Sequence, residues 1–339
     1  MSGRARRGIA VFGTSLEAMA SAGEAADRAG FDGVWTSELY NRSATVTLAA
    51  LAPRTSRAAI GSGIVYGVGR SPLMLAAEAR DLDELSGGRM ILGIGNGTRR
   101  MIADWHGLDG AAPAARIEEL VPLLRQIWNL AEQPIDHQGR FYRLKIAALD
   151  EVAAPQRPIP VYTAGVNPRM IESAGRVADG LLAHTMCNVP YLEEVARPAV
   201  ARGAEHAGRD PDEIALATFA LACASPDAEQ ARREAASMIA FYATVKSYAA
   251  VFEHSGFGAE AAAVREAFAA RDLKRMLGAV SEPMVDAFAA AGTPEEVDRQ
   301  LRRYDGAVDE VVLSVPSFQV APERVAENLS LLTASCAAR

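Results

Sequence analysis

Short runs of apolar residues alternate along the chain with longer segments in which apolar positions recur every third or fourth residue. Between the first two runs, Leu16, Met19 and Gly23 have the spacing of one helix face, and Gly30 supplies a helix stop. The short runs predict eight strands, at 8–13, 31–38, 58–66, 89–95, 159–165, 179–186, 213–225 and 308–316. The pattern therefore predicts an α/β protein in which each strand is followed by a helix.

Eight roughly equal units with no obvious reversal in their order favour a closed (β/α)8 TIM barrel. The alternative is a doubly wound open sheet, which shares the same alternation. Residues 1–339 are expected to form a single barrel domain with two insertions. A hairpin-like insertion is predicted near 133–158, turning on Gly139, and a helical insertion near 245–292.

Composition narrows the range of functions. The chain has 339 residues, 50% of them hydrophobic, with a net charge of −7 and a pI near 5.4. An acidic protein is a poor partner for nucleic acid or for an acidic membrane surface, so neither is expected. No apolar run has the length of a signal peptide core or of a membrane helix, and a cytoplasmic location is expected.

Cysteines and histidines show no metal-binding pattern. The three cysteines, Cys187, Cys223 and Cys336, are widely spaced and predict neither a disulfide framework nor a zinc site. The five histidines have no ligand spacing and no accompanying carboxylate cluster, so no metal is expected.

The segment 93–97, Gly-Ile-Gly-Asn-Gly, resembles a nucleotide-binding loop but fits neither familiar type. A dinucleotide fingerprint needs a third glycine where Thr98 stands, and it belongs to the first strand of its unit rather than the fourth. A phosphate loop of the Walker type needs Gly-Lys-Ser/Thr, which is absent. The segment is therefore interpreted as the end of the fourth strand and the loop after it.

In a TIM barrel, function is carried by the loops that follow the strands. After the fifth strand, Asn167 and Pro168 have the character of a helix N-cap and first position, and Arg169 falls in the first turn. The helix dipole disfavours a cation there, and a bound anion would reverse the penalty. A solvated arginine that faces away is the equally acceptable alternative.

Glycines crowd the third strand and its exit, at positions 61, 63, 67 and 69. Glycine within a strand indicates a bulge or the close approach of another backbone or a ligand. A loop that merely turns tightly explains the same residues.

Several blocks occur in an order that resembles the luciferase-like flavin and deazaflavin oxidoreductases. They are AGFDGVWTSELY, IGSGIV, LDELSGGRMILGIGNG, HQGRFYRL and IPVYTAGVNPRMIESAGRVADG, and they cover nearly the whole chain. The resemblance implies a TIM barrel with insertions that binds FMN or the deazaflavin coenzyme F420. It also implies hydride transfer between that cofactor and a small organic substrate, and a homodimer.

The resemblance also implies a set of cofactor-binding residues. Gly63-Ile64 would be a bulge carrying a non-proline cis peptide behind the ring, and Glu38 would contact the ring. The full set is Glu38, Gly63, Ile64, Tyr66, Asn96, Gly97, Gly165, Val166, Asn167, Arg169 and Met170. Of these, Tyr66, Asn96 and Gly97 would line the ring and ribityl chain, and the last four would form the phosphate end.

Two departures bear on the reaction. The Asp-His pair of the sugar-phosphate dehydrogenase branch is Glu38-Leu39 here, and the acidic residue after its fourth strand is Thr98, so sugar-phosphate oxidation is disfavoured. The arginine that luciferase carries near Asn96 for the FMN phosphate is also absent.

The anionic tail of F420 suits arginines at the rim of the site, and Arg99 and Arg100, with Arg42 or Arg70 as helpers, favour F420 over FMN. Two alternatives remain: an FMN-dependent monooxygenase that uses dioxygen and a partner reductase, and a non-catalytic flavin carrier. No catalytic residue is assigned. The possible proton donors are Tyr40, Tyr66, His106 and His184.

Overall fold

The computed structural model describes residues 3–148 and 154–337. The chain divides into two compact units. The first comprises Met1–Val34, Ala183–Pro198 and Leu216–Arg339, and the second comprises Trp35–Leu182 and Ala199–Ala215. Each unit is described by itself below.

Eight parallel strands form a closed barrel. In hydrogen-bonded order they are β1 (Arg6–Ala10), β2 (Gly33–Thr36), β3 (Ala59–Ser62), β5 (Met90–Gly95), β8 (Val161–Gly165), β9 (Gly180–Ala183), β10 (Ala215–Ala224) and β12 (Glu310–Ser314), and β12 pairs with β1. The short strand β4 (Val65–Tyr66) also pairs with β5. The predicted TIM barrel is confirmed, and the open sheet is wrong because the strand order returns to its start.

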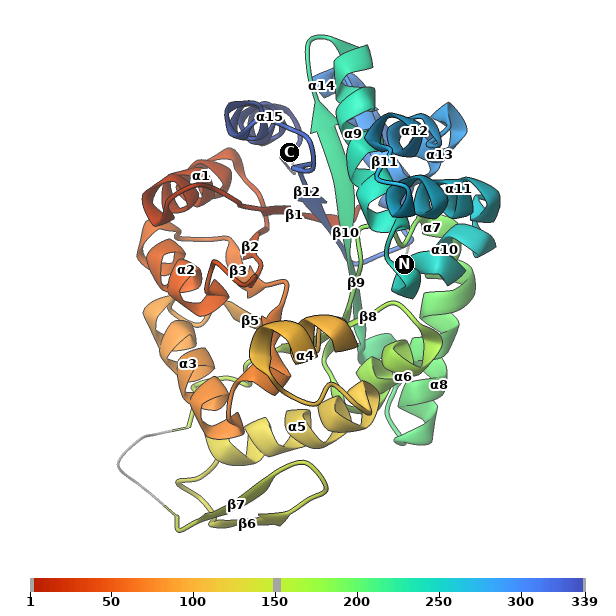
Figure 1. The fold of residues 1–339 in the computed structure, drawn as a ribbon. Coiled ribbons are helices and arrows are strands. Elements are labelled where there is room, and N and C mark those ends of the chain that lie inside the picture. Colours follow the sequence, from red (N-terminus) through yellow and green to blue (C-terminus); the bar gives the residue numbers. More distant parts are fainter. Residues whose placement is uncertain (1–2, 149–153, 338–339) are drawn as a thin grey trace. The chain divides into compact units, whose positions relative to one another are not determined.

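The second unit carries the middle strands and the helices that follow them (Figure 1). Its α-helices are α2 (Ala44–Leu51), α3 (Pro72–Leu85), α4 (Arg99–His106), α5 (Pro113–Trp128) and α6 (Pro168–Val177). The helix α8 (Arg197–His206) crosses the boundary between the units. Ser43, Ser71 and Thr98 begin α2, α3 and α4, each accepting a hydrogen bond from a first-turn amide.

The core of this unit includes Trp35, which is fully buried. Its ring lies 6.3 Å from that of Tyr162, and a Cβ on Gly61 would lie only 2.6 Å from a Trp35 ring carbon. Gly67 is similarly close to Leu120, at 2.8 Å. Two of the third-strand glycines therefore make room for side chains of the core rather than for a ligand.

An antiparallel pair, β6 (Ile135–Gln138) and β7 (Arg143–Ile146), lies beside α5 (Figure 1). The Glu119 carboxylate of α5 holds it, accepting from the backbone amides of Phe141 and Tyr142 at 2.8–3.1 Å and contacting His137 Nε2 at 3.1 Å. The predicted insertion at 133–158 includes residues 149–153, which lie outside the described residues.

The first unit contains the helices nearest the two ends of the chain and the segment predicted as a helical insertion. Its elements are α1 (Leu16–Ala29), α7 (Val189–Tyr191), α9 (Ala228–Ala243), α10 (Ala249–His254), α11 (Gly258–Ala269), α12 (Leu273–Gly278), α13 (Glu282–Phe288), β11 (Ala289–Gly292), α14 (Pro294–Leu301) and α15 (Pro322–Ser335). Ser15 begins α1 and Gly30 ends it at φ 104, as the sequence predicts. The strand β11 extends the sheet beside the last four residues of β10, and the sequence did not predict it.

No single helix among the described residues is long and apolar enough to cross a membrane. One bent pair, Ala228–Ala243 with Lys246–His254, meets the length and composition requirement across a bend of 100°.

Candidate functional site

The peptide bond between Gly63 and Ile64 is cis, so the predicted non-proline cis peptide is confirmed. It lies between β3 and β4, where the third predicted strand divides. The end of β2 holds this segment on both sides. Thr36 O accepts from Gly63 N at 2.7 Å, Ser37 Oγ donates to Gly63 O at 2.5 Å, and Glu38 N donates to Ile64 O at 3.0 Å.

The neighbouring strand β5 approaches this segment unusually closely at Gly93. Ser62 Oγ donates to Gly93 O at 2.8 Å and accepts from Gly93 N at 2.9 Å. A Cβ on Gly93 would lie 3.0 Å from the carbonyl carbon of Ser62 and closer still to its oxygen. At Gly95, a Cβ would lie 2.5 Å from Ile64 Cδ1. Gly93 therefore makes room for the backbone of Ser62, and Gly95 makes room for the side chain of Ile64.

The Glu38 carboxylate is buried and paired with Arg70 through two hydrogen bonds, of 2.7 and 2.6 Å. It also accepts from Tyr66 N at 3.3 Å, and Arg70 Nε reaches Glu78 at 3.0 Å. The hydrogen bonds to Glu38 raise the pKa of Arg70. Arg70 is committed to two carboxylates, so the structure does not offer it as a helper at the rim.

Tyr66, Asn96 and Gly97 come together at the carboxyl ends of β4 and β5. The Tyr66 ring is buried and meets His106 edge-on, with ring centroids 5.3 Å apart. Burial, with the nearby Glu38 carboxylate, raises the pKa of Tyr66 to about 12, so the phenol keeps its proton at neutral pH. Gly97 has φ 62, and a Cβ there would lie 2.9 Å from the Tyr66 ring.

The two polar atoms of the Asn96 side chain differ in their hydrogen bonding. Its Nδ2 donates to Pro113 O at 2.8 Å, which fixes the orientation of the amide. Its Oδ1 is buried and has no hydrogen-bond partner among the residues that the structure describes. A buried acceptor without a donor is costly, so this oxygen marks a position where a ligand N–H or O–H would be stabilised.

The first turn of α6 lies directly after β8. Asn167 is the N-cap, as predicted, with extended backbone and no side-chain capping bond. Gly165 permits this approach, since a Cβ there would lie 3.0 Å from Ile171 N. Val166 lies between β8 and the cap, and Met170 N already donates to Asn167 O at 2.9 Å.

The Arg169 side chain was predicted as a possible anion ligand, but it is bound to a carboxylate of the protein. Its guanidinium donates to both oxygens of Glu118 on α5, at 2.6 and 2.9 Å, and to Ser173 Oγ at 3.2 Å. These bonds raise the pKa of Arg169 and balance its charge. Arg169 therefore joins α5 and α6 through Glu118.

Of the four predicted proton donors, Tyr40, Tyr66 and His106 belong to the second unit and His184 to the first. Tyr40 is 76% exposed and packs edge-on against Trp105, at 5.3 Å between centroids. His106 lies against Tyr66, whereas His184 belongs to the first unit and packs among aromatic side chains there. The aromatic partners of His184 carried no recognisable spacing in the sequence and were missed.

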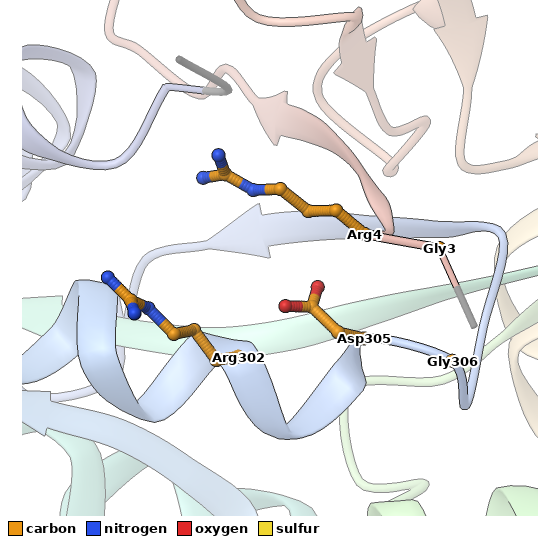
Figure 2. A pocket seen from close by; sticks show the side chains of 5 residues that line it. All are labelled: Gly3, Arg4, Arg302, Asp305 and Gly306. Atoms are coloured by element: carbon orange, nitrogen blue, oxygen red, sulfur yellow. The ribbon is translucent and has the colours of Figure 1, made fainter.

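A cavity of about 430 Å³ opens at the other end of the strands (Figure 2). Gly3 and Arg4 precede β1, Arg302, Asp305 and Gly306 precede β12, and these five residues line it. Barrel enzymes react at the carboxyl ends of their strands, so this cavity is not the candidate active site. Among residues 3–148 and 154–337, no group of three His, Cys, Asp or Glu side chains is placed to hold a metal ion.

The family described as luciferase-like monooxygenases matches residues 4–310. The chain belongs to this family. An uncharacterised protein of Mycobacterium tuberculosis is 35% identical over 317 residues, covering 91% of this chain and 92% of that protein. A 5,10-methylenetetrahydromethanopterin reductase from Methanolobus tindarius is 31% identical, covering 86% of this chain and 88% of the relative.

Solved structures of similar fold include further oxidoreductases. The coenzyme F420-dependent tetrahydromethanopterin reductase of Methanopyrus kandleri has a TM-score of 0.81 at 26% identity, covering 99% of this chain and 98% of that one. An F420-dependent secondary alcohol dehydrogenase has a TM-score of 0.71 at 19% identity, and an FMN complex of a Baeyer-Villiger monooxygenase from Pseudomonas putida has 0.66 at 18%. The last two show the fold alone. This luciferase-like protein is an enzyme of the oxidoreductase class to which these relatives belong.

Proposed function

We propose that this luciferase-like oxidoreductase transfers hydride between coenzyme F420 and a small organic substrate. The observation that carries the proposal is the match to a 5,10-methylenetetrahydromethanopterin reductase in sequence and to a coenzyme F420-dependent reductase in structure. The reductase relative is 31% identical over 294 residues, and the F420-dependent reductase structure has a TM-score of 0.81.

The residues of the second unit fit such a cofactor. In the proposal, Gly63 and Ile64 support the ring, and Tyr66, Asn96 and Gly97 line it and the chain that follows. The buried, unpartnered Asn96 Oδ1 supports this placement, because a polar ligand atom would satisfy it. The phosphate would lie at Gly165, Val166, Asn167 and Met170, at the N-terminus of α6, where the helix dipole has its positive end.

Two predicted contacts take another role in this proposal. Glu38 positions Tyr66 N and Arg70 rather than offering a free carboxylate to the ring. Arg169 is held by Glu118 and contributes through the position of α6. Both residues would therefore act on the cofactor through the backbone segments that they fix.

Two exposed arginines could bind the anionic tail of F420. Arg99 and Arg100 are exposed in the first turn of α4, directly after Asn96, Gly97 and Thr98. Arg100 also pairs with Asp104 at 3.0 Å, a surface contact that costs little to exchange. In the proposal these two cations bind the tail at the rim.

When bound, F420 supplies the hydride chemistry, and the protein supplies position and electrostatics. Tyr66 keeps its phenolic proton at neutral pH, and His184 stays neutral because burial lowers its pKa. No acid or base is assigned for the substrate.

We also propose a homodimer. Val46 on α2 and Leu73 and Met74 on α3 are 52%, 43% and 55% exposed, and these two helices pack against each other. Large apolar side chains gathered on neighbouring helices are typical of a surface that another protein covers. A second copy is the occupant proposed here, in keeping with the family resemblance.

Titration of the purified protein with F420 and, separately, with FMN tests the cofactor, using quenching of cofactor fluorescence. Tight F420 binding with weak FMN binding, followed by oxidation of reduced F420 by an organic acceptor, is the expected result. Preferential FMN binding would instead identify a monooxygenase that needs a reductase and dioxygen. F420 binding with no turnover of any acceptor would favour a carrier.

A further inference from the structure

The helix α5 begins in an irregular way at the point where it orients Asn96. Pro113, the first residue of α5, is exposed, and its carbonyl oxygen accepts from Asn96 Nδ2 at 2.8 Å. The residue before it, Ala112, is the N-cap, and its methyl side chain cannot cap the helix. Ala112 also has φ 50, a left-handed conformation that alanine rarely adopts. Contacts from other residues must therefore hold the start of α5 in place.

Arg116, three residues after Pro113, makes such contacts. Its backbone N donates to Ala112 O at 3.0 Å, and its Nη2 donates to Asp109 O at 3.3 Å. The Asp109 carboxylate in turn accepts from Ala111 N at 2.9 Å. The turn at residues 109–112 is therefore tied to α5 by Arg116 and to itself by Asp109.

The guanidinium group of Arg116 also contacts the β6–β7 hairpin. Its central carbon lies 4.5 Å from the centre of the Phe141 ring and 6.0 Å from that of Tyr142. A guanidinium group is attracted to the face of an aromatic ring, and its planar shape lets it stack there. The two rings therefore restrict the orientation of the group that donates to Asp109 O.

The hairpin is itself fixed to α5 next to Arg116. Glu119 follows Arg116 by three residues, a spacing that places the two side chains side by side on a helix. Its carboxylate accepts from the backbone amides of Phe141, at 3.0 and 3.1 Å, and of Tyr142, at 2.8 Å. A Cβ on Gly139 would overlap this carboxylate, so glycine lets the hairpin turn close onto the helix.

We propose that Arg116 is a positioning residue of the cofactor site. The β6–β7 hairpin orients its guanidinium group, and Arg116 fixes the turn before α5, from which Pro113 O orients the Asn96 amide. The inference rests on the proposed function in taking Asn96 as a contact of F420. It gives a role to the block HQGRFYRL at residues 137–144, which the proposed function does not otherwise use. All of these residues belong to the second unit.

The first test compares F420 dissociation constants, measured by fluorescence titration, for wild type and three variants. Arg116→Gln removes the guanidinium group, Phe141→Leu removes the ring beneath it, and Phe141→Tyr keeps a ring there. The backbone bonds from residue 141 to Glu119 are available in all of them. Arg116→Gln and Phe141→Leu are expected to weaken F420 binding by about threefold or more, and Phe141→Tyr should bind F420 as wild type does.

The same change in an Asn96→Ala protein distinguishes positioning from a general structural role. If Arg116 acts through Asn96, Arg116→Gln should cause no further loss of F420 affinity once the Asn96 amide is gone. An equal loss in both backgrounds would overturn the inference, as would unchanged affinity in Arg116→Gln alone.

Lys145→Gln is the matched control on the hairpin. Lys145 is 81% exposed on β7, and its ammonium group lies 3.6 Å from Asp136 of β6. This variant is expected to bind F420 with wild-type affinity. A loss as large as that in Arg116→Gln would overturn the specific role of Arg116.

Hydrogen–deuterium exchange of the ligand-free proteins, followed by mass spectrometry, separates this inference from the proposed function. Arg116→Gln and Phe141→Leu are expected to speed exchange of the amides at residues 109–116 by about threefold or more, and Phe141→Tyr and Lys145→Gln to leave it unchanged. If wild type does not bind F420 but exchange responds in this way, the cofactor proposal fails and the link from hairpin to turn stands. Exchange that ignores Arg116→Gln and Phe141→Leu would overturn the inference, whether or not F420 binds.

Discussion

Replacing Gly93 with alanine should weaken the barrel where β3 and β5 meet. The new Cβ would lie 3.0 Å from the carbonyl carbon of Ser62 and overlap its oxygen, and backbone cannot turn aside as a side chain can. The strands would have to separate by roughly 1 Å, at an overpacking cost of about 1–3 kcal/mol. The two hydrogen bonds between Ser62 Oγ and the Gly93 backbone would also be strained, at about 1 kcal/mol each.

Alanine also lowers the conformational entropy of the unfolded chain, which stabilises the folded state by about 0.4–1 kcal/mol. The expected net loss is therefore about 2–5 kcal/mol, a large share of the ~5–15 kcal/mol that stabilises a typical domain. Urea unfolding followed by circular dichroism measures it, with Gly278→Ala as control. Gly278 ends α12 with no atom within 4 Å of a Cβ, so that variant should be neutral or slightly more stable. A Gly93→Ala protein within about 0.5 kcal/mol of wild type would refute the close backbone contact.

Three other substitutions test separate parts of the structure. Asn96→Ala should weaken F420 binding by about tenfold, because it removes the acceptor proposed for the ligand; fluorescence titration measures it, and unchanged affinity would remove Asn96 from the site. Glu119→Gln should destabilise by about 1–2 kcal/mol at pH 7. Burial alone would raise the pKa of Glu119, but hydrogen bonds from His137, Tyr142 N and Phe141 N lower it on balance. The stability that the Glu119 carboxylate contributes is therefore fully present above the ordinary glutamate pKa of 4.5 and is lost as pH falls below it. The unfolding free energies of wild type and Glu119→Gln should converge when they are measured at decreasing pH, and a constant difference down to about pH 3 would contradict this. Val46→Glu with Met74→Glu should convert a dimer to a monomer in sedimentation velocity, and an unchanged dimer would place the interface elsewhere.

The barrel was predictable because each strand is a short apolar run followed by an amphipathic helix with its own start signal. The helix α6 begins at Pro168 after Asn167 in both prediction and structure, since N-cap and first-turn preferences are local. The strand β11 was missed because Ala-Ala-Ala-Gly has no strand propensity, and pairing with β10 alone makes it a strand.

The chemistry of individual side chains was less predictable. Arg169 pairs with Glu118, 51 residues away, and Glu38 pairs with Arg70, 32 residues away. Whether an arginine meets a ligand or a carboxylate is decided by these distant partners, and no local pattern records them. The cis peptide at Gly63-Ile64 was expected only through the family resemblance.

A crystal structure of the protein with F420 tests the central claim most directly. The deazaflavin ring should lie against Gly63 and Ile64, with a ligand atom hydrogen-bonded to Asn96 Oδ1 and the phosphate at the first turn of α6. F420 bound instead in the cavity between Arg4 and Arg302, or a first turn of α6 without the phosphate, would contradict the account.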